Sequence, residues 1–108
     1  MDKKLMLAYL YDIYGSLLGE KHRDAFEMYY CEDLSLSEVA EHLDITRQGV
    51  RDKLRHAGEE LIRLEDALHL FEKYGEIKKL VEEIKGVSGE DNGDVSTLCD
   101  KVISLIDN

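Results

Sequence analysis

The fold is decided by residues 34–57, which read LSLSEVAEHLDITRQGVRDKLRHA. Ser35 followed three residues later by Glu38 has the spacing of a capping box, in which the serine hydroxyl accepts a hydrogen bond from a free amide and the glutamate reaches back. Val39, Ala40 and Leu43 then supply a short apolar face at helical spacing. The pattern predicts a short helix that begins just after Ser35.

A turn and a second helix follow. Residues 44–46 interrupt the apolar rhythm, and the Thr46 hydroxyl can cap a helix that opens with Arg47. Asp44 is one of the few side chains that tolerate the positive φ of a tight turn, and Ala40 is small where two helices must cross. The second helix is expected to bury one apolar face, made of Val50, Leu54, Ala57 and Leu61. This arrangement is typical of a DNA-binding helix-turn-helix unit, whose second helix enters the major groove.

Charge distinguishes the second helix from the rest of the chain. Residues 46–57 carry four basic side chains and one acid, a local excess of +3 in a chain of formal charge −10, so the remaining residues carry −13. Arg47, Arg51 and Arg55 recur every four residues and are predicted to line one helix face, opposite the buried positions 50, 54 and 57. The candidate nucleic-acid-binding residues are Arg47, Gln48 and Arg51, which suit base edges, and Lys53 and Arg55, which suit phosphates.

Apolar residues recur at helical spacing over most of the remaining sequence, and no segment alternates strictly enough for a strand. Helices are predicted at residues 3–18, ended by Gly19 in a left-handed conformation, and at residues 20–30. An apolar stripe then runs from Leu61 to Ile84, with a phase slip near Tyr74-Gly75. Residues 86–93 have the composition of a flexible linker. Asp94 or Ser96 can cap a last helix, whose apolar side is expected to hold Val95, Leu98, Val102, Leu105 and Ile106.

The long stripe has consequences for organisation. It exceeds what a three-helix core can cover, so it either folds back on the first helix or packs against a second copy of the chain. We expect a homodimer. Residues 1–60 form the helix-turn-helix domain in this interpretation, and residues 61–108 form a helical extension that packs on it as a single structural unit. The predicted fold class is an all-α helix-turn-helix bundle with a long helix and a C-terminal helix.

Composition narrows the class of protein. The 108 residues are 44% hydrophobic, which excludes wholesale disorder, and no apolar run approaches the ~20 residues of a membrane span. The start of the sequence leads into an amphipathic stretch without a cleavage site, so no export signal is expected. Cys31 and Cys99 lie far apart and are interpreted as reduced, mostly buried thiols. Together these features predict a cytoplasmic protein.

Residues that could carry chemistry are scattered. The four histidines fall on different predicted helices, and although Glu38 and His42 share a face, two ligands without a third favour a surface pair over a metal site. No ordering of cysteine or serine with histidine and an acid indicates a nucleophile. The glycine-rich residues 86–93 lack the lysine and the preceding strand of a phosphate-binding loop. The sequence therefore predicts a non-enzyme with no catalytic residues, no cofactor and no metal.

A family resemblance rests on these same residues. Residues 29–57, YYCEDLSLSEVAEHLDITRQGVRDKLRHA, resemble the YlxM family of small bacterial proteins, which is related to the fourth region of RNA polymerase sigma factors. The resemblance continues upstream through residues 10–30, LYDIYGSLLGEKHRDAFEMYY, and downstream through the acidic helical part. Three positions depart from the family pattern: Thr46 replaces a common serine, Arg51 a common tyrosine and His56 a common basic residue. Thr46 keeps the cap, and Arg51 adds charge to the presented face.

The resemblance implies function as well as fold. It implies a sigma-factor region-four-like helix-turn-helix protein that acts as a regulator or accessory of the signal recognition particle pathway. Engagement of the particle's GTPase or its small RNA, and a homodimer, are further implications of the resemblance. The partners expected are therefore DNA or a small structured RNA, the GTPase, and a second copy of the chain.

Two alternatives stay open beside the nucleic-acid-binding accessory. In the first, the chain is an acidic helical adaptor that binds the basic GTPase without nucleic acid, because its strongly negative surface would steer it there. The arginine row would then be a solvated face with ion pairs, for which Arg55 and Glu59 have the right spacing. In the second, the chain is a transcription regulator unrelated to secretion, which predicts a palindromic operator with half-sites ~34–36 Å apart.

Overall fold

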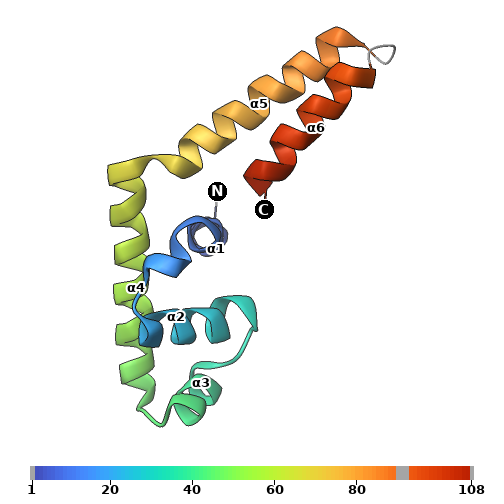
Figure 1. The fold of residues 1–108 in the computed structure, drawn as a ribbon. Helices are drawn as coiled ribbons and strands as arrows, with labels where there is room; N and C mark the ends of the chain where they lie inside the picture. The colour runs from blue at the N-terminus through green and yellow to red at the C-terminus, as the bar shows by residue number, and fades with distance from the viewer. Residues whose placement is uncertain (1, 90–92, 108) are drawn as a thin grey trace. The chain divides into compact units, whose positions relative to one another are not determined.

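The computed structural model describes residues 2–89 and 93–107, and within these ranges every regular element is helical. The chain divides into two compact units, Met1–His69 and Leu70–Asn108. Figure 1 shows the helices of both units. The predicted all-α fold class is confirmed. None of the helices in the described part of the chain is long and apolar enough to cross a membrane.

The first unit contains four α-helices that surround one core. They are α1 (Lys3–Tyr14), α2 (Glu20–Phe26), α3 (Leu36–Leu43) and α4 (Arg47–Leu68), with a 3-10 turn at Gly15–Leu17 and a π-helical turn at Glu27–Cys31. Helix α4 packs against α1, α2 and α3 and so organises the unit. The expected domain boundary after residue 60 falls inside α4, whose backbone hydrogen bonds continue to its end at Leu68.

The first predicted helix is shorter than expected. Helix α1 ends at Tyr14, and the chain tightens into the 3-10 turn, where buried Gly15 packs so closely on the Tyr11 ring that a Cβ would lie 2.9 Å from it. Gly19 is extended, with φ −59° and ψ 150°, and serves as the N-cap of α2. The predicted left-handed stop at Gly19 is therefore wrong, because the 3-10 turn has already ended the helix.

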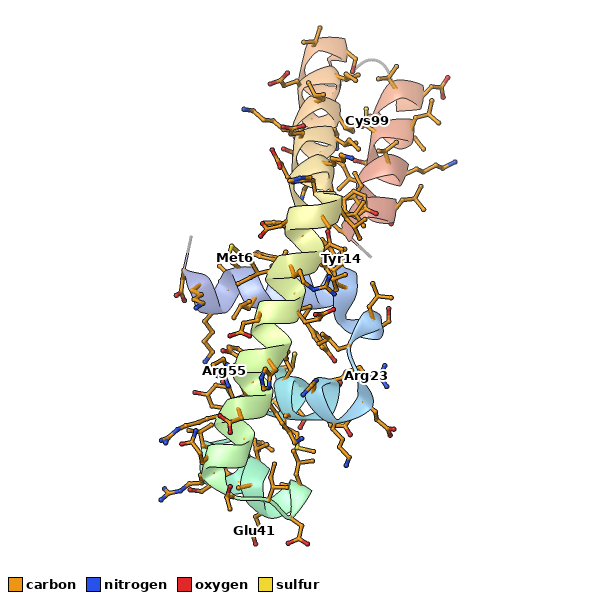
Figure 2. All side chains as sticks on the ribbon, turned by 90° about the vertical axis from the view of Figure 1, so that its left-hand side faces the viewer. Met6, Tyr14, Arg23, Glu41, Arg55 and Cys99 are labelled. Atoms are coloured by element: carbon orange, nitrogen blue, oxygen red, sulfur yellow. The ribbon has the colours of Figure 1, made fainter. Side chains whose placement is uncertain are left out.

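The core of the first unit lies between α4 and the three shorter helices. The hydroxyl of Tyr14 donates to Glu65 Oε1 across 2.7 Å and ties α1 to α4 (Figure 2). Gly58 is buried where α1 packs on α4, and a Cβ there would lie 3.6 Å from Leu7, an ordinary van der Waals distance. Burial of one large apolar side chain is worth roughly 1.5–3 kcal/mol. The largest fully buried side chains are Tyr14, Phe26, Leu10, Leu61, Val39 and Val50.

The apolar stripe that starts in α4 does not continue as one helix. His69 adopts a left-handed conformation with φ 55°, and its N–H donates to Glu65 O across 2.8 Å, which ends α4. Gly75, near which the apolar pattern slips in phase, lies inside the next helix and does not interrupt it. The interruption instead falls five residues before Tyr74, where a histidine takes a conformation that most side chains avoid.

The second unit is a pair of packed helices, α5 (Leu70–Ser88) and α6 (Gly93–Asp107). Ion pairs join Lys78 Nζ to Asp107 Oδ2 at 3.1 Å and Lys85 Nζ to Asp100 Oδ1 at 2.7 Å. Among its described residues the predicted linker is wrong except at Gly89, because α5 includes residues 86–88 and α6 begins at Gly93, whereas Gly89, at φ 75°, leaves the helix. Residues 90–92 of the predicted linker lie outside the described part of the chain.

Helix α6 differs from its prediction at its start and in its buried face. It begins at Gly93, so Asp94 and Ser96, the two expected caps, lie within its first turn. Its buried residue is Cys99. Of the five residues that the sequence predicts on its apolar side, Leu98, Val102 and Leu105 are exposed, whereas Val95 and Ile106 are half-buried. The face of α6 that packs against α5 is therefore centred on Cys99 and not on the predicted apolar side.

The two cysteines are free thiols in different surroundings. Cys99 is buried, as predicted, whereas Cys31 is exposed, which the sequence did not predict. Desolvation raises the pKa of the Cys31 thiol, and the nearby carboxylates of Glu27, Asp12 and Glu32 raise it further. The thiol therefore stays protonated at neutral pH, which disfavours its reactivity.

Candidate nucleic-acid interface

The helix-turn-helix begins with the capping box that the sequence predicts. Ser35 N donates to Glu38 Oε1 across 3.0 Å, and Glu38 N donates to Ser35 Oγ across 3.1 Å. The backbone hydrogen bond, and then the side-chain hydrogen bond, from Ser35 lower the pKa of the Glu38 carboxyl. This carboxylate is thus occupied by the helix start, and both Glu38 and His42 are exposed on α3. Among the described residues no cluster of three or more side chains could hold a metal ion.

The turn between α3 and α4 depends on two residues. Asp44 has φ 54° and ψ 47°, the left-handed conformation that the sequence predicts for it, and ends α3. The Ile45 N–H then donates to Ala40 O across 3.1 Å. Thr46 Oγ1 accepts from Gly49 N across 2.9 Å, so the predicted N-cap of α4 is confirmed. These contacts fix the direction in which α4 leaves the turn.

Asp44 provides a test of the turn. Replacing Asp44 by valine should lower the free energy of unfolding by about 1–2 kcal/mol, because a β-branched side chain resists the left-handed conformation. Replacing it by glycine should change stability by less than about 1 kcal/mol. Urea denaturation of both variants measures the difference, and equal stability of the valine variant and the wild type would contradict the role of φ at this residue.

The five candidate residues lie on the first three turns of α4, and their side chains differ in availability. Arg47, Gln48, Arg51 and Arg55 are exposed, and Lys53 is half-buried. Within the described part of the chain, the side chains of Arg47, Arg51 and Lys53 form no ion pair or hydrogen bond. Their charges are therefore available to a polyanion.

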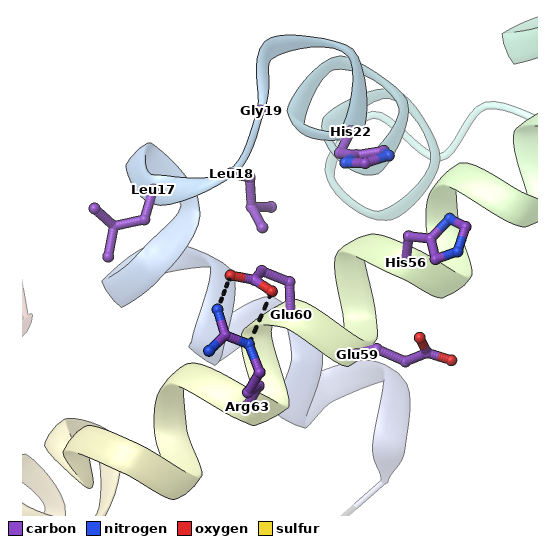
Figure 3. A pocket seen from close by; sticks show the side chains of 8 residues that line it. All are labelled: Leu17, Leu18, Gly19, His22, His56, Glu59, Glu60 and Arg63. Atoms are coloured by element: carbon purple, nitrogen blue, oxygen red, sulfur yellow. Dashed lines mark hydrogen bonds and ion pairs between the residues drawn. The ribbon is translucent and has the colours of Figure 1, made fainter.

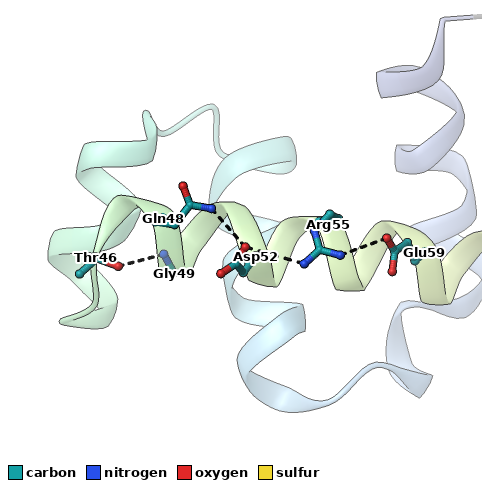
Figure 4. A network of polar contacts seen from close by, with 6 residues as sticks. All are labelled: Thr46, Gln48, Gly49, Asp52, Arg55 and Glu59. Carbon is teal, nitrogen blue, oxygen red and sulfur yellow. Dashed lines mark hydrogen bonds and ion pairs between the residues drawn. The ribbon is translucent and has the colours of Figure 1, made fainter.

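Arg55 is already engaged by carboxylates of its own helix. Its Nη1 lies 3.4 Å from Glu59 Oε1, and its Nη2 lies 3.8 Å from Asp52 Oδ1 (Figure 4). The spacing of Arg55 and Glu59 in the sequence indicated the first of these contacts. Arg55 is consequently a poorer phosphate ligand than Arg47 or Arg51, since its guanidinium must exchange partners to bind.

The arginine row does not lie opposite the core as predicted. A four-residue step turns the helix about 40° beyond a full turn, so the row crosses the flank of α4 diagonally. Asp52 lies opposite the buried Val50 and Leu54, at the centre of the outer face. The sequence contains the signal for this placement, because positions two residues apart on a helix point to nearly opposite sides. Arg51 lies between the core and the outer face.

The sequence of the chain is similar to those of known proteins. The sequence model of one family, UPF0122, described as "Putative helix-turn-helix protein, YlxM / p13 like", matches residues 1–100. The chain belongs to this family. The match includes all of α3, the turn and α4, and so agrees with the helix-turn-helix geometry. The resemblance predicted from residues 10–57 is confirmed.

Several curated members of the UPF0122 family are similar over most of their length. A UPF0122 protein of Caldanaerobacter subterraneus subsp. tengcongensis is 49% identical over 84 residues, which cover 78% of this chain and 72% of the relative. One from Bacillus thuringiensis is 38% identical over 91 residues, covering 84% and 83%. One from Shouchella clausii is 36% identical over 107 residues, covering 99% and 96%.

An open groove of about 550 Å³ lies beside α4, away from its first turns (Figure 3). Glu60 and Arg63, both on α4, form a two-point ion pair on one side of the groove, with Arg63 Nη2 2.6 Å from Glu60 Oε1 and Nε 3.1 Å from Oε2. This pairing lowers the pKa of Glu60 and raises that of Arg63. The rings of His22 and His56 have centroids 6.0 Å apart. Because the groove's arginine and one of its carboxylates neutralise each other, the groove does not extend the cationic interface.

Proposed function

We propose that this helix-turn-helix protein binds nucleic acid through the first turns of α4 and does no catalysis. One observation carries the proposal: Arg47, Arg51 and Lys53 have no partner within the described chain and lie on the helix that such a unit presents to a groove. Arg47 and Arg51 suit base edges or phosphates, and Lys53 suits a phosphate.

The test is titration of labelled duplex DNA and of a structured RNA hairpin with the purified protein by fluorescence anisotropy. Binding should weaken steeply between 50 and 200 mM salt, because each neutralised phosphate releases counterions. The chain's overall charge of −10 opposes binding at long range, but this repulsion is screened beyond ~8 Å at physiological ionic strength. Failure to bind either probe at 50 mM salt would refute the proposal.

We further propose that the protein acts in the cytoplasm as an accessory or regulator of the signal recognition particle pathway, as the family resemblance implies. A basic protein partner such as the particle's GTPase suits the acidic surface outside α4, which supports the adaptor alternative as well. A nucleic-acid bridge and a direct adaptor predict different results in the same pull-down.

In that pull-down, tagged protein is incubated with cell lysate and the GTPase is detected by immunoblot, with and without nuclease. We expect the GTPase to be recovered in untreated lysate and lost after nuclease if nucleic acid joins the two. Retention after nuclease would instead identify the adaptor. Absence of the GTPase in both samples would contradict a role in this pathway and leave the transcription regulator, whose operator should be palindromic.

A homodimer is the remaining part of the proposal. Both helices of the second unit expose apolar side chains at the three-and-four spacing of a helical seam. They are Ile77, Leu80, Ile84 and Val87 on α5, and Leu98, Val102 and Leu105 on α6. Leu61, where the predicted stripe begins, is fully buried in the first unit, so it is not part of the proposed seam.

Light scattering at micromolar concentration should give the mass of a dimer. The double variant Ile84→Lys/Leu105→Lys should be monomeric, because two charges would have to be buried at the seam. The variant Ser104→Lys adds a charge at an exposed polar neighbour of Leu105 and should stay dimeric. A monomeric mass for the wild type would contradict the dimer.

A further inference from the structure

A chain of polar contacts runs along the outer face of α4 (Figure 4). Gln48 Nε2 donates to Asp52 Oδ1 across 3.2 Å, and Asp52 Oδ1 also lies 3.8 Å from Arg55 Nη2. Glu59 follows at 3.4 Å from Arg55. Asp52 is therefore held between an amide and a guanidinium, one turn before and one turn after it, at the centre of the face that points away from the core.

A carboxylate at this place conflicts with simple phosphate binding. The proposed function puts this face of α4 against a polyanion, and Asp52 would then be repelled by any phosphate that it approached. Its side chain is 50% exposed, so it is not buried for packing. A helix that recognised only phosphates would do better with a neutral residue here.

The edges of base pairs carry hydrogen-bond donors, which phosphates lack. In the major groove of duplex DNA, cytosine presents its N4 amino group and adenine its N6 amino group as hydrogen-bond donors, and an aspartate accepts from the former. A carboxylate has about four lone-pair sites, and Gln48 and Arg55 use one of the two oxygens of Asp52. Oδ2 has no partner among the described residues and can accept from a base.

We infer that Asp52 is a specificity-determining residue that accepts a hydrogen bond from a base amino group in the major groove of duplex DNA. Gln48 and Arg55 orient its carboxylate before binding, while Arg47 and Arg51 on the flank supply affinity. The inference rests on the proposed function and deepens it, because it selects the ligand. The major groove of A-form RNA is deep and narrow and cannot be read by side chains, so a residue that reads there indicates duplex DNA.

The experiment selects duplexes from a library with a randomised 20-base-pair core and compares three proteins. The wild type should enrich duplexes with cytosine or adenine at one fixed position. Asp52→Asn, which removes the charge and adds an amide donor, should reduce that preference by about tenfold. Asp52→Ala serves as a second variant that removes the acceptor entirely, and circular dichroism checks that each variant is folded.

The matched control is Glu59→Gln. Like the Asp52 variants, this substitution removes one negative charge from the outer face and one ion-pair partner of Arg55. Glu59, however, lies two helical turns farther than Asp52 from the turn between α3 and α4. If Asp52 acts only by repulsion, both variants should bind all sequences more tightly by the same factor. If Asp52 reads a base, Glu59→Gln should keep the preference of the wild type.

Each outcome supports the inference or overturns it. Loss of the preference in the Asp52 variants alone supports base reading by this carboxylate. An unchanged preference in both Asp52 variants overturns the inference while the proposed function stands, and so does a wild type that binds the RNA hairpin but no duplex. A wild type that binds neither nucleic acid overturns the inference and the proposed function together.

Discussion

Replacing Arg47, Arg51 and Lys53 together by alanine should lower the affinity for duplex DNA at 50 mM salt on the order of 100-fold. These are the candidate cations that no carboxylate of the described chain engages, so their full charge contributes to binding. Fluorescence anisotropy measures the loss. The slope of log K against log salt should also become shallower by about 1 for each phosphate contact removed.

A charge-matched triple variant separates a specific interface from a general effect of charge. Lys73, Lys79 and Lys101 are exposed side chains of the second unit, and they too form no ion pair within the described residues. Their replacement by alanine changes the net charge by the same amount and should alter affinity by less than about threefold, because they lie in the other unit. Equal losses in the two triple variants would contradict an interface on α4.

The single variants should rank according to their contacts. Arg51→Ala should weaken binding more than Arg55→Ala, because Arg55 must first leave Asp52 and Glu59. Exposed ion pairs are worth little, typically below about 1 kcal/mol, so the difference should be a fewfold change rather than an abolition. The reverse order would indicate that the intrahelical pairs orient Arg55 for binding instead of occupying it.

The sequence predicted those parts of the fold that neighbouring residues determine. The capping box at Ser35, the left-handed Asp44 and the cap at Thr46 each depend on contacts within four or five residues, and all three are confirmed. The ends of helices that lack such local signals are harder to predict from the sequence. The left-handed His69 has no glycine or proline beside it in the sequence, and nothing local distinguishes it from a helical residue.

The face that a helix buries also depends on its partner. The sequence shows an apolar stripe on α6 but not which side of that stripe meets α5, so Cys99 and not Leu98 is the buried residue. For the candidate site, the sequence placed all five candidate residues on one helix, as the structure does, but placed the arginine row one quarter-turn from its position. The reason is that adjacent residues of an α-helix lie about 100° apart, so Arg51, which directly follows the buried Val50, cannot lie opposite it.

The stability of the first unit should depend strongly on Phe26. Its ring is fully buried and stacks between Tyr11, with centroids 4.7 Å apart, and Tyr30, with centroids 4.4 Å apart. Phe26→Ala should lower the free energy of unfolding by about 3–5 kcal/mol, because it removes the buried ring and both aromatic contacts. Urea denaturation followed by circular dichroism measures this loss.

A control for Phe26 is Leu17, whose side chain is 63% exposed in the same unit. Leu17→Ala should change stability by less than about 0.5 kcal/mol. Helix α2 packs against α4, so loss of the Phe26 ring should also affect α4. At temperatures where the Phe26→Ala variant is partly unfolded, we expect it to bind nucleic acid more weakly than the wild type does. Binding that stays at the level of the wild type while the first unit is unfolded would show that α4 does not need its bundle, and would contradict recognition by a preformed helix-turn-helix.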